Sequence, residues 1–576
     1  AQTCLSVPRP ALWWPSGYGA QPLYDLHMQL RRDDTVLDGL EDRVGLRTVE
    51  LDRTPDPEEA GAESFTFRIN GVRIFAKGAN WIPLDCLSGR MDRPRYEELL
   101  DLLVEAHGNM LRVWGGGQYE KDDFYRLADE RGILVWHDFM FACARYPDDP
   151  DFIAEVRAEA EHQVRRLRNR TCVVLWAGNN ENDWIEDASN RAEPGHDFPG
   201  KSLYHRHLPE IVRRLDPSRP YWPSSPYGGD DHNGEQAGDR HNWHVWHGGV
   251  LPRRFGEEPR RDPSPEGVSY RHYLEDTARF ASEFGMHASP VLETLRRNLP
   301  ASELSFGSEG LLFRNKDTPK DKGNALMLAH TGLPRDLDEY IDLSMICQAE
   351  GLKLALEHYR RRKFHCSGAL FWQWNDCWPG LSWSVLDYYA FPKASYFFVK
   401  RAYAPVLASF AERPDGAVEV WLTNDLPAPV DETLTWTHAT FDGQVLDRGE
   451  VHAHGPANAS MCVARVEPGG GGRRGQFLWL EGGDRVPYNR HFFAEVKDLV
   501  RERPAVSVEW ERSGDALVAT LVCERHAYFV NLFAPVEGTR YSDNWFDLFP
   551  DKPRRVSIRP PEGARLGPEG VEVAWR

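Results

Sequence analysis

Between residues 72 and 405 the sequence alternates short apolar runs with longer amphipathic stretches, and this rhythm limits the fold more than any other feature. The apolar runs are β-branched and aromatic enough for strands buried on both faces, and the stretches between them have helical periodicity. Eight such units over about 330 residues predict a (β/α)8 TIM barrel. The longest helix is expected at residues 343–364, and the strands at 72–83, 109–117, 133–141, 171–182, 221–227, 240–249, 279–286 and 365–378.

The segments on either side of the barrel alternate apolar with polar residues and lack helical periodicity. Before the barrel, YDLHMQLR (24–31) and SFTFRI (64–69) alternate, and Asn70-Gly71 is a strong hairpin signal. Beyond Pro405, short alternating strands separated by turn residues indicate β-sandwiches. We therefore expect a multidomain chain with an incomplete antiparallel sandwich at 1–71, the barrel at 72–405, and two β-sandwich domains at 406–502 and 503–576.

Composition narrows the classes of function. The formal net charge of −19 argues against nucleic acid or an anionic membrane surface as a partner. Twenty tryptophans suit stacking on sugar rings, although tryptophan is equally a common core residue. The nine cysteines lack metal-site spacing, so neither disulfides nor structural zinc are expected. No signal-peptide pattern is visible at the N-terminus, so a cytoplasmic location is expected.

Two glutamates occupy similar places in predicted barrel strands. Glu181 follows the apolar run of the fourth strand, and Glu283 lies in the seventh. Parallel barrels keep their active sites at the carboxyl ends of the strands. Two carboxyl groups there suffice for glycoside hydrolysis, one as proton donor and the other as nucleophile or base. Either glutamate alone is more simply a solvated strand-end residue, but the pair favours a hydrolase.

The other strand ends supply amides, indoles and charged groups, which suits a pocket for neutral hydroxylated rings. We predict as substrate-binding residues Asn80, Arg112, Trp114, Asp138, Asn180, His241, Trp246, Trp372, Asn375 and Asp376. A metal-dependent hydrolase is a less favoured alternative, because the histidines and aspartates lack a ligand-spacing motif. The sequence also contains no GxSxG nucleophile elbow. We expect no metal and no cofactor.

Several motifs give the chain a family resemblance over nearly its whole length. They are GANWIP (78–83), LRVWGGGQYE (111–120), LWAGNNEN (175–182), SEFG (282–285), FWQWNDCWPGLSWSVLDYY (371–389) and SDNWFDLFP (542–550). With these motifs the chain resembles the β-mannosidase branch of glycoside hydrolase family 2. The resemblance implies a retaining exo-β-mannosidase with Glu181 as acid/base and Glu283 as nucleophile. It further implies that Asn180 binds the sugar 2-hydroxyl and that the flanking sandwiches are immunoglobulin-like.

One departure from the family pattern concerns the N-terminal side. Family members carry a jelly-roll domain before the first sandwich, and we find no counterpart of it in the sequence. We therefore expect an incomplete first sandwich, a more open sugar subsite, and self-association through the exposed sandwich edge. Two alternative functions stay open: another family 2 β-glycosidase such as a glucosaminidase, and a truncated carbohydrate-binding fragment with weak or no activity.

Overall fold

The eight predicted barrel strands all form, and each pairs in parallel with its neighbours. The strand order runs from β6 to β10 on one side of β6, and through β13 and β12 to β11 on the other. In the described residues the ladder is open between β10 and β11. The strands are β6 (Ala76–Trp81), β7 (Met110–Val113), β8 (Leu134–Asp138), β9 (Val173–Ala177), β10 (Tyr221–Trp222), β11 (Arg240–Asn242), β12 (Ala281–Phe284) and β13 (Gly368–Phe371).

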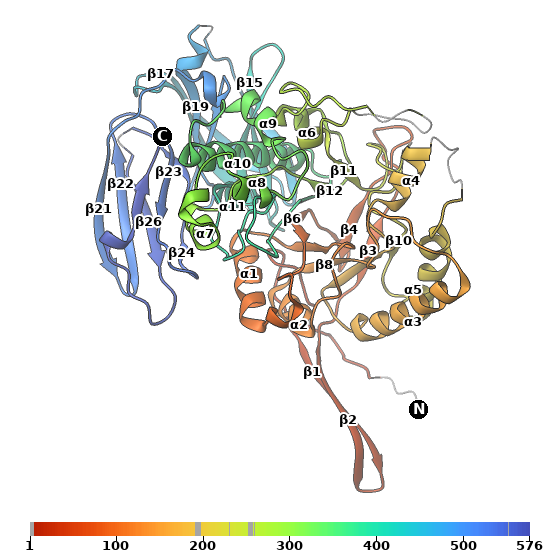
Figure 1. Cartoon of the computed structure of the whole chain (residues 1–576). Helices are drawn as coiled ribbons and strands as arrows, with labels where there is room; N and C mark the ends of the chain where they lie inside the picture. Colours follow the sequence, from red (N-terminus) through yellow and green to blue (C-terminus); the bar gives the residue numbers. More distant parts are fainter. Residues whose placement is uncertain are drawn as a thin grey trace.

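This TIM-like barrel occupies the middle of the computed structural model, with the C-terminal β-domains on one side and a long hairpin projecting from another (Figure 1). The structure describes residues 5–190, 197–229, 231–250, 257, 260–469, 471–550 and 552–576, with the backbone alone for 187–190.

The fifth and sixth strands are shorter than predicted. β10 ends at Trp222, because Pro223 and Pro226 have no amide N–H to extend the ladder. β11 ends at Asn242, and the chain then turns sharply through the short helix α6 (His244–His247). An isolated parallel bridge between Asn180 and Ser225 continues the pairing past β10. These breaks bring loop residues over the carboxyl end of the barrel.

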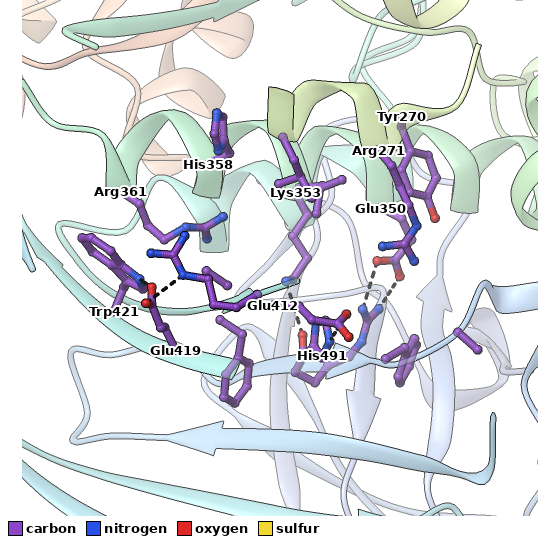
Figure 2. A pocket seen from close by; sticks show the side chains of 18 of the residues that line it. Tyr270, Arg271, Glu350, Lys353, His358, Arg361, Glu412, Glu419, Trp421 and His491 are labelled. Atoms are coloured by element: carbon purple, nitrogen blue, oxygen red, sulfur yellow. Dashed lines mark hydrogen bonds and ion pairs between the residues drawn. The ribbon is translucent and has the colours of Figure 1, made fainter. Parts of the chain in front are cut away.

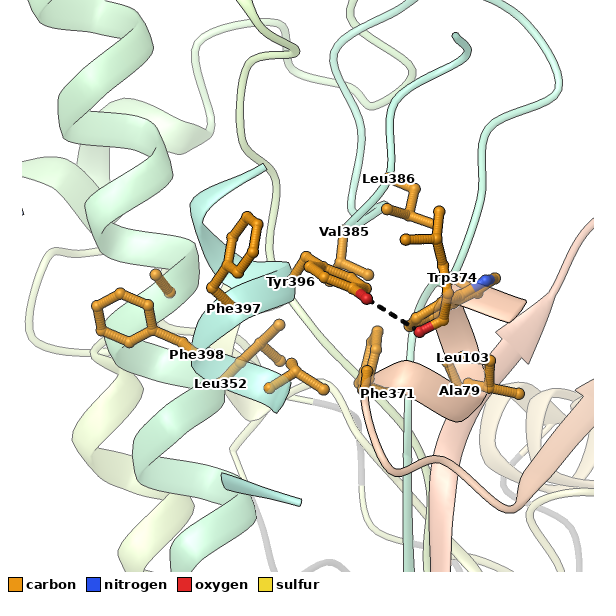
Figure 3. Packing of buried hydrophobic residues seen from close by; sticks show 14 of the residues in the cluster. Ala79, Leu103, Leu352, Phe371, Trp374, Val385, Leu386, Tyr396, Phe397 and Phe398 are labelled. Carbon is orange, nitrogen blue, oxygen red and sulfur yellow. Dashed lines mark hydrogen bonds between the residues drawn. The ribbon is translucent and has the colours of Figure 1, made fainter. Parts of the chain in front are cut away.

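Helices surround the barrel as the alternation predicts. The longest begins at Leu337, earlier than expected, because the Asp336 side chain accepts a hydrogen bond from the Glu339 amide and caps it. Leu352 and Phe398, from the last two helices, lie in the same buried cluster as Trp374, shown in Figure 3. The helices are α1 (Arg93–Glu105), α2 (Asp122–Arg131), α3 (Pro150–Leu167), α4 (Asn182–Asn190), α5 (Leu208–Leu215), α7 (Leu292–Asn298), α8 (Glu309–Phe313), α9 (Gly323–His330), α10 (Leu337–Arg361) and α11 (Ala394–Ala402).

The segment before the barrel forms two separate antiparallel sheets. β1 (Tyr24–Arg32) and β2 (Thr35–Val44) make the projecting hairpin, while β3 (Val49–Asp52), β4 (Thr66–Ile69) and β5 (Val72–Arg73) make a second sheet. Asn70 and Gly71, both at positive φ, form the predicted turn between β4 and β5. That these residues belong to an incomplete immunoglobulin-like sandwich stays a prediction.

The second of these sheets closes the amino-terminal end of the barrel. Phe65 and Phe67 are fully buried and pack on Trp136 and Phe280, with ring centroids 5.5–6.2 Å apart. Leu134 and Leu370, from two barrel strands, lie in the same cluster. Aromatic side chains from the segment before the barrel therefore fill the barrel interior at its amino-terminal end. The carboxyl end is left for the site.

Two β-domains, each of two sheets, follow the barrel. The first pairs β14-β15-β18 and β17-β16-β19-β20, and the second β21-β22-β26-β24 and β25-β23-β27. Their strands are β14 (Val406–Glu412), β15 (Val418–Asn424), β16 (Val430–Thr440), β17 (Val445–Gly455), β18 (Ala459–Val466), β19 (Gln476–Glu481), β20 (Asn489–Phe492), β21 (Val506–Ser513), β22 (Ala516–Cys523), β23 (Ala527–Phe533), β24 (Arg540–Tyr541), β25 (Phe546–Leu548), β26 (Arg554–Arg559) and β27 (Glu572–Ala574).

A buried charge cluster joins the barrel to the first β-domain. Asp425, just after β15, accepts hydrogen bonds from Lys77 Nζ, Arg360 Nη2 and Lys363 Nζ, each at 2.8 Å. Lys77 belongs to β6, Arg360 is in α10, and Lys363 lies in the turn that follows. All four side chains are buried. One carboxylate thus holds three cations of the barrel.

Candidate active site

The two predicted glutamates lie together at the carboxyl end of the barrel. Glu181 follows β9, and Glu283 is in β12. A carboxylate oxygen of each lies within 4.8 Å of the other, and Glu283 is 5 % exposed. Glu181 has φ of 65°, an uncommon conformation for a residue with a side chain, and its amide donates to the Ser225 carbonyl at 2.8 Å. The backbone is held so that the Glu181 carboxyl turns into the barrel mouth.

Arg112, at the end of β7, positions the nucleophile candidate. Its Nη1 donates to Glu283 Oε2 at 2.8 Å and to Asn80 Oδ1 at 2.9 Å. Its Nη2 donates to Asp138 Oδ2 and to Asn180 Oδ1, both at 2.7 Å. Arg112 and Asp138 are fully buried, and their ion pair fixes the guanidinium plane.

His241, in β11, contacts the acid/base candidate. Its Nδ1 lies 2.9 Å from Glu181 Oε1, and its Nε2 lies 3.0 Å from Ser225 Oγ. The Ser225 hydroxyl also lies 2.6 Å from Asp239 Oδ2. Burial lowers the pKa of His241 to about 4, so the imidazole is neutral near pH 7.

Two further side chains contact the glutamates. The Cys143 thiol donates to Glu181 Oε2 at 3.3 Å, and Trp243 Nε1 donates to Glu283 Oε1 at 3.2 Å. Cys143 lies in the loop after β8, and no sequence signal marks it. Trp243 lies within the predicted sixth strand, 240–249, whose end we expected to contribute indoles to the pocket, and in the structure it directly follows β11.

The predicted tryptophans form much of the aromatic wall near the site. Trp114 and Trp372 meet edge to face at 4.9 Å, and Trp372 continues to Trp383 at 6.5 Å. Trp246 instead donates its Nε1 to Asp317 and stacks on His287. The wall ends at Trp243, 6.2 Å from Trp383 between ring centroids, and so reaches Glu283.

The remaining predicted residues are engaged within the protein. The Asn80 amide donates to the Ser282 carbonyl, and the Asn375 amide to the Ile82 carbonyl. Asp376 accepts from Lys316 at 2.6 Å and from the Ser382 and Ser384 hydroxyls. Asn80 and Asp138 therefore position Arg112, while Asp376 orders the loop after β13. Direct contact of any of these residues with a substrate stays a prediction.

Burial dominates the ionisation of both glutamates. It raises the pKa of Glu181, against the lowering effects of the Cys143 hydrogen bond and of Arg112. It also raises the pKa of Glu283, against the lowering effects of His241 and Arg112, and the Glu181 charge adds to the rise. The Arg112 contact therefore lowers the pKa of Glu283 by less than burial raises it. Two such carboxyls at short range favour the state with one shared proton.

Binding of a metal ion at the two glutamates would be electrostatically unfavourable. Ligand atoms of Glu181, His241 and Glu283 lie within 4.8 Å of one another, a spacing that a divalent cation accepts. However, the permanent charge of Arg112 already lies 2.8 Å from Glu283. A second cation at this point would be repelled, so the donor set fits carboxyl chemistry better than metal binding.

Glu181 opens onto a cavity of about 260 Å³ whose lining also includes Trp184, His241 and Trp243, and Trp243 in turn contacts Glu283. A second cavity, of about 640 Å³, lies away from them between the barrel and the first β-domain (Figure 2). Its charged walls are internally paired: Lys353 with Glu357, Arg413 with Glu419, and Arg490 with Glu350. We interpret this second cavity as a polar junction between domains.

Two properties of the described residues concern disulfide bonds and membrane-spanning helices. Their eight cysteines are all free thiols. No helix among them is both long and apolar enough to cross a bilayer.

Comparison with known proteins identifies the family. Residues 1–47 match the model of glycosyl hydrolases family 2, 416–498 that of the mannosidase Ig/CBM-like domain, and 502–573 that of an Ig-fold domain. The β-domains after the barrel are therefore immunoglobulin-like. Beta-mannosidase B of Emericella nidulans is 36 % identical over 424 residues, which cover 70 % of this chain and 48 % of that protein. The chain spans about half the length of the curated relatives it matches.

Among solved structures, the β-D-mannosidase of Dictyoglomus thermophilum superposes with a TM-score of 0.90 and 38 % identity, over 99 % of this chain and 68 % of that one. The exo-chitosanase CsxA of Amycolatopsis orientalis gives a TM-score of 0.73 at 16 % identity, over 99 % and 71 % of the two chains, and shows the shared fold alone. On the first of these similarities, together with the matched models, the chain belongs to the β-mannosidase branch of glycoside hydrolase family 2.

Proposed function

We propose that this chain carries the catalytic centre of a retaining exo-β-mannosidase, which removes terminal non-reducing β-D-mannose residues. The observation that carries the proposal is the short separation of two differently held carboxyls. A retaining enzyme needs its carboxyl groups about 5–5.5 Å apart, whereas an inverting enzyme needs about 6.5–9.5 Å. Oxygens of Glu181 and Glu283 within 4.8 Å of each other fit the retaining spacing. The relatives named β-mannosidases support mannose as the sugar.

The contacts of each carboxyl suggest its role. Glu283 accepts from Arg112 and Trp243, one donor on each oxygen, which favours its ionised form and suits a nucleophile. Among the described residues the hydrogen-bond partners of Glu181 are a neutral imidazole and a thiol. Burial raises the pKa of Glu181 against the lowering effect of the thiol, which favours the protonated form and suits an acid.

The reaction then proceeds in two displacements. Glu283 attacks the anomeric carbon, the bond to the leaving oxygen breaks, and that oxygen takes the proton of Glu181. In the second step Glu181 removes a proton from water, the water oxygen bonds to the anomeric carbon, and Glu283 leaves as a carboxylate. Asn180, held by Arg112, would bind the sugar 2-hydroxyl.

Glu283→Gln tests the nucleophile. We expect turnover of an aryl β-mannoside to fall by several orders of magnitude, because Glu181, the one other carboxyl group in this cluster of described residues, is needed as the acid/base. Glu186→Gln is the matched control, since Glu186 is also buried but pairs with Arg145 in the loop after β8. A panel of aryl β-glycosides that includes the β-glucosaminide tests the sugar. Normal activity of Glu283→Gln, or preference for another sugar, would refute the proposal.

Glu181→Ala tests the acid/base separately. A good leaving group needs no proton, so the first step should survive while hydrolysis of the intermediate slows. Azide should then restore turnover and yield a β-glycosyl azide. Failure of azide to do either would remove Glu181 from this role.

We further propose that the β1–β2 hairpin mediates self-association with a second copy of the chain. Its exposed apolar side chains include Met28, Leu30, Val36, Leu37 and Leu40, which are 43–61 % exposed. Such a surface favours burial against a partner. Sedimentation of the chain and of a Leu30→Lys/Leu40→Lys variant tests this: the variant should stay monomeric at concentrations where the parent associates, and equal behaviour would exclude the hairpin.

A further inference from the structure

A chain of hydrogen bonds leads from the buried carboxylate of Asp239 to the carboxyl of Glu181. The Ser225 hydroxyl connects Asp239 Oδ2, at 2.6 Å, with His241 Nε2, at 3.0 Å. His241 Nδ1 then meets Glu181 Oε1 at 2.9 Å. Asp239, Ser225 and His241 are all buried, so no bulk water competes for these contacts.

The surroundings of Asp239 determine which way the Ser225 hydroxyl points. Asp239 Oδ1 accepts from Trp222 Nε1 at 2.7 Å and from the Tyr227 amide at 3.1 Å. Its Oδ2 also accepts from the Ser282 hydroxyl at 2.6 Å. Asp239 is therefore an acceptor throughout, and the one proton of the Ser225 hydroxyl points towards it. Ser225 Oγ then offers a lone pair to His241.

The position of the imidazole proton follows from this. Arg112 Nη1 lies 3.5 Å from His241 Nε2, but its two hydrogens are already donated to Asn80 and Glu283. The Ser225 lone pair is thus the partner that remains for Nε2, which must supply the proton. A neutral imidazole has a single N–H, so Nδ1 is left with a free lone pair.

We propose that Asp239, acting through Ser225, fixes His241 in the tautomer protonated on Nε2, so that the Nδ1 lone pair accepts the acidic proton of Glu181. This inference rests on the proposed function, because it assigns a positioning role within that reaction. The lone pair stabilises protonated Glu181 and disfavours its carboxylate. After Glu181 has passed its proton to the leaving oxygen, the same lone pair makes the carboxylate a stronger base towards water.

Asp239 reaches Glu181 through Ser225 and His241, so a change at Asp239 tests the tautomer of His241. Among the described residues, the titratable or charged side chains that contact Glu181, influence its pKa or line its cavity are Arg112, Cys143, His241, His244, His247, Arg260, Arg261 and Glu283.

Asp239→Asn is the first test. Its amide NH2 would donate to Ser225 Oγ, the hydroxyl would turn to donate to Nε2, and the imidazole proton would move to Nδ1. Nδ1–H then donates to the Glu181 carboxylate and lowers the pKa of the acid. We expect the basic limb of the kcat/KM–pH profile to move down by about one pH unit. The loss of rate should be larger for poor leaving groups than for activated ones.

Two serine variants supply a second test and a matched control. Ser225→Ala removes the acceptor for Nε2–H, and we expect the basic limb to move down as well. Ser282→Ala also removes a hydroxyl from Asp239 Oδ2 but leaves the contact with His241, so the limb should stay. The proposal would be overturned if the basic limb of the kcat/KM–pH profile stayed in place in both Asp239→Asn and Ser225→Ala. It would also be overturned if Ser282→Ala moved that limb as far as these two variants do.

Nitrogen-15 NMR of histidine-labelled protein reads the tautomer without any activity. The His241 signals are those that disappear in His241→Gln, and they should show protonated Nε2 and unprotonated Nδ1 in the parent chain. Asp239→Asn should reverse this pattern. A protonated Nδ1 in the parent would refute the inference while leaving the proposed function intact, and inactivity towards β-mannosides with the expected tautomer would refute the function alone.

Discussion

Asp425→Asn should be the most destabilising single change at the junction between the barrel and the first β-domain. The substitution keeps the shape but leaves Lys77, Arg360 and Lys363 buried without a counter-charge. An NH2 group also replaces one of the two carboxylate oxygens that accept their hydrogen bonds at 2.8 Å. The cations retain carbonyl partners, such as Tyr403 O for Lys77 and Asn424 O for Lys363. Removing one partner of a buried ion pair costs about 3–5 kcal/mol. For a barrel of about 330 residues that corresponds to a fall in melting temperature of roughly 4–7 °C.

The stability of Asp425→Asn should also depend on pH in a way that can be predicted. Burial already lowers the pKa of Lys77 to about 8, and without Asp425 it should fall further. Unfolded lysine titrates near 10.4, so between these values the unfolded variant binds more protons than the folded one. Its stability then rises with pH, and the deficit should be larger at pH 6 than at pH 9.

Differential scanning calorimetry at pH 6, 7.5 and 9 measures both effects. Asp415→Asn is the control, because Asp415 also pairs with an arginine, Arg465, at 2.6 Å, but on the exposed surface. We expect little change in that variant. A deficit of Asp425→Asn as small as that of the control, or one that does not vary with pH, would show that the cluster does not act as argued.

Two further substitutions probe the site. Trp372→Ala should weaken ground-state and transition-state binding together by about 1–3 kcal/mol if its indole stacks on the sugar. A drop in melting temperature with unchanged kinetics would instead identify Trp372 as a core residue. Its contacts with Trp114 and Trp383 are compatible with that role as well. Cys143→Ala removes the thiol donor that lowers the pKa of Glu181, so the acid form should persist to higher pH and the basic limb of kcat/KM should move up. A downward shift in Cys143→Ala would mean that the thiol does not donate to Glu181.

The barrel could be predicted because each strand is buried on both faces and each helix has a single apolar face. Glu181 and Glu283 could be placed for the same reason, since they end or lie within such strands. Depth within the barrel could not be read from the sequence. Asn80 and Asp138 occupy strand ends as expected, yet they contact Arg112 and not the cavity. The position of a residue in its strand determines whether its side chain points into the barrel. Whether that side chain reaches the cavity depends on which other side chains lie between the two.

The connecting residues were harder to foresee. Ser225 and Cys143 lie in loops whose positions depend on contacts far apart in the sequence, and no local pattern marks them. Asp239 shares a face with His241, two residues later, so alternation along the strand offered a signal. The segment before the barrel shows a different limit. Its alternation predicts strands, but the burial of Phe65 and Phe67 inside the barrel depends on the shape of another domain.

Arg112 spends all five of its N–H donors within the protein: two on Asp138 and one each on Asn80, Asn180 and Glu283. It therefore has no N–H group left that could donate a hydrogen bond to the substrate. If Glu283 becomes an ester, the guanidinium loses one of its two carboxylate neighbours and faces a weaker, neutral acceptor. The covalent intermediate would then hold an excess of positive charge that disappears when the carboxylate is released. The residue that aligns the nucleophile would in this way also favour its regeneration.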